Sequence, residues 1–141
     1  MVIAVADKTL EKVYADIEVD NVRLRSKFVA SEPLLTGADF KRLTANGSIQ
    51  VGQLEEWLAS RAIFSIAHDG QLLVPAFQLH DNHPRPVIAR VLEQLSRMTD
   101  WQIAFWFVSS NPALDGLPPI LVLDDEEAIL AAAAEVDGYV G

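Results

Sequence analysis

The dipeptide Asp69-Gly70 stands between two apolar-rich runs, Ala62–Ala67 and Gln71–Pro75. Asp-Gly in this setting is a strong signal for a two-residue β-hairpin turn, because both residues tolerate the positive backbone φ of a type I′ turn. Pro75 has no backbone N–H, so the second strand should end there or lie at a sheet edge. We therefore expect one β-hairpin near the middle of the chain.

Two short helices are predicted before this hairpin. Thr36 can cap a helix that runs to about Ala45, with Asp39 in the capping-box position where Glu or Gln is more usual, and Asn46-Gly47 would end it. A second helix, Gln53–Ser60, would bury residues at helical spacing, namely Leu54, Trp57 and Leu58. Helix, turn, helix and hairpin is the element order of a winged helix-turn-helix.

Apolar periodicity also predicts a helix at the N-terminal end, over Thr9–Ala30. A heptad seam runs through Leu10, Tyr14, Ile17, Asn21, Leu24 and Phe28. A single Asn in such a seam can fix register and oligomeric state, so Tyr14, Asn21 and Phe28 are candidates for a homodimer contact. The alternative is one amphipathic helix that packs on its own domain, with Asn21 at its exposed edge.

The second half of the sequence is predicted to be mainly helical. After a loop at His80–Arg85, Pro86 is well placed to begin a helix through Val87–Met98. Trp101–Ser109 is apolar nearly all round, and a cap at Thr99 or Asp100 favours a buried helix over a buried strand. The remaining segments are a loop at Asn111–Pro119, an apolar stretch at Ile120–Leu123, and a last helix at Asp125–Val136 with Asp124 and Glu127 as a capping pair and Gly138 after its end.

These elements predict a mainly α protein with one β-hairpin: a degenerate winged helix-turn-helix followed by a small helical domain. We expect an N-terminal helical arm at 1–33, the helix-turn-helix with its hairpin at 34–85, and the helical domain at 86–141. The 141 residues suffice for one domain with a small appendage. With no signal-peptide pattern and no apolar run long enough to span a bilayer, we expect a cytoplasmic protein without membrane contact.

The net charge of −9 is distributed unevenly. Residues 1–61 hold eight basic and nine acidic side chains, whereas residues 62–141 hold three and eleven. A surplus of carboxylates argues against nonspecific binding to nucleic acid, because phosphate neutralisation needs cations. A basic protein surface is the more plausible partner of the second half.

No catalytic residues are predicted. There is no cysteine, no nucleophile elbow and no phosphate-binding glycine loop, so we expect a protein that is not an enzyme and needs no cofactor. His80, Asp81 and His83, with His68 in the hairpin turn, are the one cluster of metal-ligand types, but an exposed turn explains the same residues and no metal is expected.

Three residues are candidates for DNA contact through the second helix: Gln50, Gln53 and Arg61. Glu55 and Glu56 lie beside them, and the hairpin tip has no Lys or Arg. One alternative is therefore a DNA-binding regulator that uses its C-terminal half for dimerisation. If the chain does not bind DNA, the helix-turn-helix would serve only as a scaffold.

The C-terminal half resembles the toxin-binding domain of Xre/MbcA/ParS-type antitoxins. The resemblance is carried by Trp106, by the loop Asn111-Pro112-Ala113-Leu114-Asp115-Gly116, and by Pro118-Pro119-Ile120 before the closing helix. Upstream, Trp57, the hairpin and Pro75-Ala76-Phe77-Gln78 are similar to family versions with a short helix-turn-helix, so the resemblance covers roughly Leu35–Val136.

The resemblance implies a protein that neutralises a cognate toxin of the RES type, a class that attacks NAD or transfers ADP-ribose. It implies toxin contact through Trp106, Asn111, Pro112, Leu114, Asp115 and Gly116, and a homodimer or larger complex. Pro119 stands where the family usually has Leu, so the local geometry of this loop is expected to differ from that of the family. Many family members also repress their own operon, but the helix-turn-helix here lacks the basic surface expected of a repressor, which argues against such autoregulation.

Overall fold

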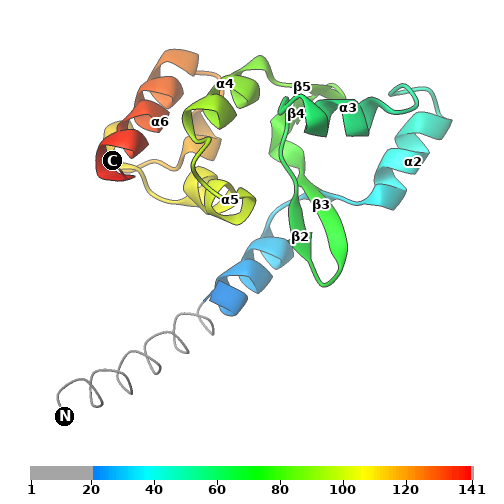
Figure 1. Cartoon of the computed structure of the whole chain (residues 1–141), viewed down its shortest axis with the longest axis horizontal. Helices are drawn as coiled ribbons and strands as arrows, with labels where there is room; N and C mark the ends of the chain where they lie inside the picture. The colour runs from blue at the N-terminus through cyan, green and yellow to red at the C-terminus, as the bar shows by residue number, and fades with distance from the viewer. Residues whose placement is uncertain (1–20, 141) are drawn as a thin grey trace, which may run out of the picture. The chain divides into compact units, whose positions relative to one another are not determined.

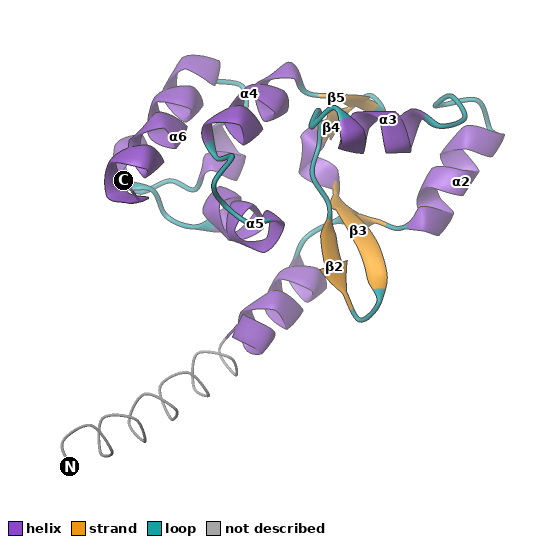
Figure 2. Ribbon diagram, viewed as in Figure 1, coloured by secondary structure: helices purple, strands orange, loops and turns teal. Residues whose placement is uncertain are grey.

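The computed structural model describes residues 21–140, with side chains up to Val136, and the chain divides into two units between Glu32 and Pro33. In the first unit, residues 21–31 are helical. The larger unit is mainly helical with small antiparallel sheets, and Figures 1 and 2 show the course of its elements. Of the predicted dimer seam, Tyr14 lies outside the described residues, Asn21 is half-buried and Phe28 is 4% exposed.

The two predicted short helices are present. α2 spans Gly37–Ala45 and α3 spans Gln53–Ala59. Thr36 caps α2 through a complete capping box, since its hydroxyl accepts from the backbone N–H of Asp39 and the Asp39 carboxylate accepts from the backbone N–H of Thr36. Trp57 of α3 is buried in a cluster with Phe40 and Ile49, so the two helices share one small core.

The predicted hairpin is confirmed, but its first strand is shorter than expected. β2 is Ile66–His68 and β3 is Gln71–Pro75, joined by Asp69 and Gly70 at φ of 49° and 74°. Both values are positive, as a type I′ turn requires. β3 ends at Pro75 and also pairs with β1 (Leu34–Leu35), a strand too short for the sequence to indicate, giving the sheet order β1-β3-β2.

The prediction of a single hairpin, with a loop at His80–Arg85, is wrong. After the short 3₁₀ helix η1 (Ala76–Gln78), β4 (Leu79–His80) pairs with β5 (His83–Pro84), and His80 lies opposite His83. Asp81 and Asn82 make the turn at φ of 52° and 64°. Asp and Asn tolerate this left-handed conformation because their short side chains hydrogen-bond locally, which allows a hairpin turn without glycine.

Three helices form the C-terminal part of the larger unit: α4 (Pro86–Gln94), α5 (Asp100–Val108) and α6 (Glu126–Val140). Pro86 begins α4, and Thr99 caps α5 in a capping box with Gln102, so the helix reading of this apolar segment is confirmed. α6 differs from the expectation at both ends. Asp125, not Asp124, accepts from the backbone N–H of Ala128 and caps the helix, which continues past Gly138.

Aromatic side chains join the hairpin region to the helices. Phe107 of α5 stacks on Phe64 with ring centroids 6.0 Å apart and contacts Phe77 at 4.8 Å. Trp101 donates its indole N–H to the backbone carbonyl of Ala67 in β2, at 3.0 Å. The β-hairpin therefore packs directly on α5.

Gln78 is the one polar residue buried in the core among the described residues. Its side-chain oxygen accepts from the backbone N–H of Phe64 at 2.8 Å, and its amide nitrogen donates to the carbonyls of Phe64 and Pro75 at 2.9 and 3.1 Å. The amide thus takes the place of a strand partner for these backbone groups, and it ties the segment at Phe64, just before the hairpin, to the segment that follows β3.

Candidate binding surface

The loop predicted to contact a partner is an ordered structure built around Asn111. Between α5 and α6 it contains two 3₁₀ turns, η2 (Pro112–Leu114) and η3 (Pro119–Val122). The side-chain oxygen of Asn111 accepts from the backbone N–H of Ala113, and its backbone carbonyl accepts from Leu114 and Gly116. Its own N–H donates to the carbonyl of Leu117, so one residue closes the loop on both sides.

Of the remaining loop residues, some anchor the loop to the core and others are exposed on its surface. Leu114 is 6% exposed and fastens the loop to the core, so it supports the surface rather than forming it. Asp115 and Gly116 have φ of 55° and 84° and turn the chain outward, while the Ser110 hydroxyl donates to the Gly116 carbonyl at 2.7 Å. Pro112, Asp115 and Gly116 are exposed and are the predicted loop residues on the surface.

Two leucines missed by the sequence reasoning lie in the second half of this loop. Leu117 is 47% exposed and Leu121, in η3, is 68% exposed. The sequence could not single them out, because an apolar stretch after a Pro-rich loop is equally typical of core. Isolated exposed leucines are common on protein surfaces, but these two lie only four positions apart in one ordered loop. We call these two side chains the leucine ridge.

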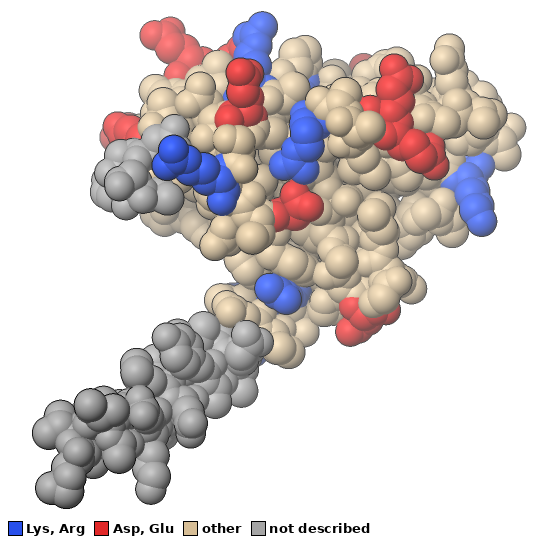
Figure 3. All heavy atoms as spheres, viewed as in Figure 1, with Lys and Arg blue, Asp and Glu red and all other residues tan. Residues whose placement is uncertain are grey.

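The ridge lies in an acidic stretch of sequence. No Lys or Arg follows Arg97, whereas eight Asp and Glu residues lie between 98 and 141. Arg85 reaches Asp124 at 3.5 Å and Arg90 pairs with Glu126, so two cations of α4 and its cap partly neutralise the start of α6. The face drawn in Figure 3 carries separate charged side chains of both signs on a largely uncharged surface.

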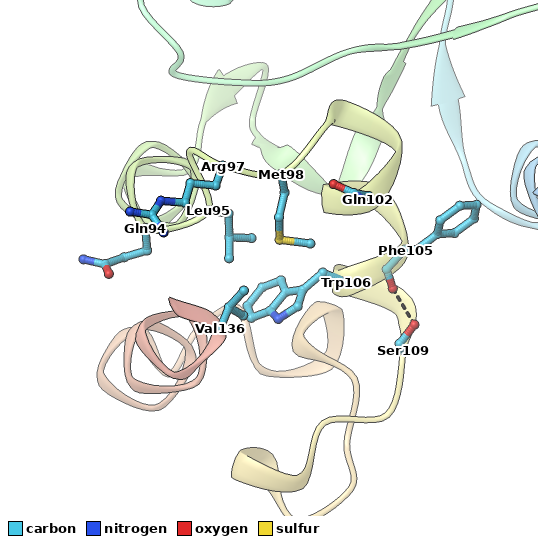
Figure 4. A pocket seen from close by; sticks show the side chains of 9 residues that line it. All are labelled: Gln94, Leu95, Arg97, Met98, Gln102, Phe105, Trp106, Ser109 and Val136. Atoms are coloured by element: carbon cyan, nitrogen blue, oxygen red, sulfur yellow. Dashed lines mark hydrogen bonds between the residues drawn. The ribbon is translucent and has the colours of Figure 1, made fainter. Parts of the chain in front are cut away.

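Trp106, the predicted contact residue on α5, lies in a different feature from the loop. It lines a groove of about 530 Å³ together with residues from the end of α4, from α5 and from α6. Figure 4 shows its ring facing Val136, with Leu95 and Met98 across the groove. Trp106 also meets Phe107 edge to face at 5.1 Å, so its ring is held by the core on one side and faces the groove on the other.

The three candidate DNA-contacting residues are not gathered into a cationic surface. Arg61 has a positive φ of 59° and its guanidinium pairs with Asp100 at 3.1 Å. The Gln53 amide donates to Glu56 at 3.3 Å, and Gln50 is exposed in the turn before α3. Their polar groups are therefore largely directed to the protein's own carboxylates.

The histidines lie in two separate turns. His80 and His83 face each other across β4 and β5, and each of His68 and His80 has the neighbouring aspartate at 3.4 Å. In the part of the chain that the structure describes, no three His, Asp or Glu side chains come together as metal ligands would.

Comparison with models of protein families, with curated proteins and with solved structures found no significant match for this chain. Between residues 21 and 140, no helix is long and apolar enough to cross a membrane.

Proposed function

We propose that this chain is an antitoxin-like protein that binds and neutralises a cognate toxin by protein–protein contact, without catalysis of its own. The proposed partner is a RES-type protein that attacks NAD, and the proposed setting is the cytoplasm. In this proposal, α2, α3 and the β2–β3 hairpin would be a degenerate winged helix-turn-helix, and residues 86–141 would be a toxin-binding-like domain. A homodimer is part of the same proposal.

The observation that carries the proposal is the leucine ridge beside the loop closed by Asn111. Ordering the loop in advance lowers the entropy that a partner must overcome on binding. Leu117 and Leu121 together expose apolar surface that gains free energy when a partner removes it from water. An ordered, partly apolar surface of this kind is suited to protein contact.

Charge supports a basic partner. Asp115 is exposed in the loop, and Asp124 and Asp125 are exposed just after the ridge. Exposed carboxylates close in sequence to exposed leucines favour a partner surface that is both apolar and cationic, because complementary potentials speed association and reject partners of the same sign. An enzyme that binds anionic NAD would have such a surface.

Co-expression in a bacterial host with the product of the neighbouring reading frame tests the proposal. We expect the wild-type chain to restore growth, and the double variant Leu117→Asp/Leu121→Asp to fail at equal protein levels. Leu72→Asp is the matched control, because Leu72 in β3 is 47% exposed, as Leu117 is. If the neighbouring product stays toxic beside the wild-type chain and no complex copurifies, the proposal is wrong.

A DNA-binding regulator is the second candidate, favoured by the order of α2, α3 and the β2–β3 hairpin. The Arg61–Asp100 pair and the carboxylates of Glu55 and Glu56 weigh against it. Fluorescence anisotropy with upstream DNA at low salt decides: binding at micromolar protein that Arg61→Gln weakens would favour this candidate, and absence of binding would remove it.

A further inference from the structure

The groove that contains Trp106 has the composition of a ligand pocket. Its walls are mainly apolar, from Leu95, Met98, Trp106 and Val136, and its volume of about 530 Å³ suits a small organic molecule. Four polar side chains complete the lining: Gln94, Arg97, Gln102 and Ser109. None of the described residues that line the groove is a carboxylate, although the chain as a whole has a net charge of −9.

Arg97 sets the charge of the ligand. From residue 42 onward the sequence holds five arginines and no lysine, and four of these arginines pair with a carboxylate: Arg42, Arg61, Arg85 and Arg90. Among the described residues, no carboxylate pairs with Arg97, whose side chain lies with Gln94 at one edge of the groove in Figure 4. Of the five arginines from residue 42 onward, Arg97 is thus the one with no carboxylate partner among the described residues, and it lies at the groove.

Trp106 supplies an apolar wall of the groove. Its ring is half-buried there. In Figure 4 the indole nitrogen lies on the edge of the ring that is turned away from Leu95 and Met98, so the ring offers the groove its apolar face. The ring face and Met98 suit a flat aromatic or aliphatic body.

The same charges limit the ligand to a single anionic group. The groove offers one guanidinium, while the surrounding segment from residue 98 onward carries carboxylates and no cation. A polyanion, such as a nucleotide or an acidic peptide, would meet net repulsion there. A monoanion with a mostly apolar body fits both the walls and the charge.

We propose that the groove between the end of α4, α5 and α6 binds a small monocarboxylate with an aromatic or aliphatic body. Its carboxylate would pair with Arg97 at the rim, and its body would lie between Trp106, Met98 and Val136. The residues that line the groove do not include Leu117 or Leu121, so this proposal is tested separately from the contact proposed at the leucine ridge.

The probe is 2-naphthoate, with its neutral analogue 2-naphthalenemethanol for comparison. Binding is followed by methyl NMR, which reports Leu95, Met98 and Val136 individually. We expect these methyl signals to shift saturably with naphthoate below ~5 mM, a range in which even weak ligands are detected. Arg97→Gln should weaken naphthoate about tenfold, since it removes a charge-assisted hydrogen bond, and leave the neutral analogue within about twofold.

Arg90→Gln is the matched control. Arg90 is an exposed arginine near the groove helices that pairs with Glu126 and does not line the groove, so its variant should bind naphthoate as the wild type does. Equal unfolding midpoints for both variants would show that they fold. The proposal is overturned if the groove methyl groups do not shift saturably, or if Arg97→Gln and wild-type protein bind naphthoate equally well.

Discussion

Replacing Gln78 with leucine is the sharpest test of how the core is held together. Gln78 is fully buried, and its amide makes three hydrogen bonds to backbone groups of Phe64 and Pro75. Leucine has nearly the same size but neither donor nor acceptor. It would leave the N–H and carbonyl of Phe64 and the carbonyl of Pro75 without these partners, away from water.

The magnitude follows from these three contacts. Each buried polar group left unpaired costs about 1–3 kcal/mol, and the greater hydrophobicity of leucine offsets a part of this. We expect Gln78→Leu to lower the free energy of unfolding by about 3–5 kcal/mol. Domains of this size have about 5–15 kcal/mol in total, so the variant should be marginally stable.

Urea unfolding followed by circular dichroism measures the effect. With a slope of ~1.5 kcal/mol per M, the midpoint should fall by about 2–3 M. Gln71→Leu is the control, because Gln71 is exposed in β3 and its variant should lie within about 0.5 kcal/mol of wild type. If Gln78→Leu also unfolds within about 1 kcal/mol of wild type, the amide does not hold the hairpin as argued.

Three further variants test local features. Thr99→Ala removes the cap of α5 and should destabilise the protein by about 1 kcal/mol in urea unfolding. Gly116→Ala places a side chain at φ of +84°, and should cost about 1 kcal/mol in the same assay although nothing lies closer than 3.7 Å to the new Cβ. The backbone N–H of Thr36, its hydroxyl and Arg42 hold the pKa of Asp39 below its ordinary value. This carboxylate therefore stabilises the fold above its ordinary pKa, and its contribution disappears as the pH falls through the lowered value. Between pH 5 and pH 2.5, the urea midpoint of Asp39→Asn should fall less than that of wild type. Equal falls would contradict this.

Local signals in the sequence were sufficient for much of the fold. The box of Thr36 and Asp39, the turn at Asp69-Gly70 and Pro86 at the start of α4 each depend on residues a few positions apart, and each is present in the structure. The β4–β5 hairpin was missed because its turn, Asp81-Asn82, lacks glycine and its strands are two residues long. The cap of α6 was off by one residue, since Asp124 and Asp125 offer the same chemistry to the same helix start.

The candidate site could be predicted only in part. The loop was found because its residues are distinctive, but the role of Asn111 in closing it depends on backbone contacts with Leu117. The leucine ridge and the groove could not be predicted. The exposure of the residues in both features depends on how α5, η3 and α6 pack together. An apolar pattern in the sequence does not reveal this packing. Gln78 gave no signal either, because only the fold shows that a glutamine is buried.

Direct titration of the purified product of the neighbouring reading frame into this chain tests the central claim most directly. Isothermal titration calorimetry should show a dissociation constant of about 1 μM or tighter for wild type, at least tenfold weaker binding for Leu121→Asp, and unchanged binding for Leu72→Asp. The affinity should fall as salt is raised, because the proposed partner surface is basic. Absence of binding by wild type, or equal affinity for the Leu121→Asp variant, would contradict the proposed binding surface.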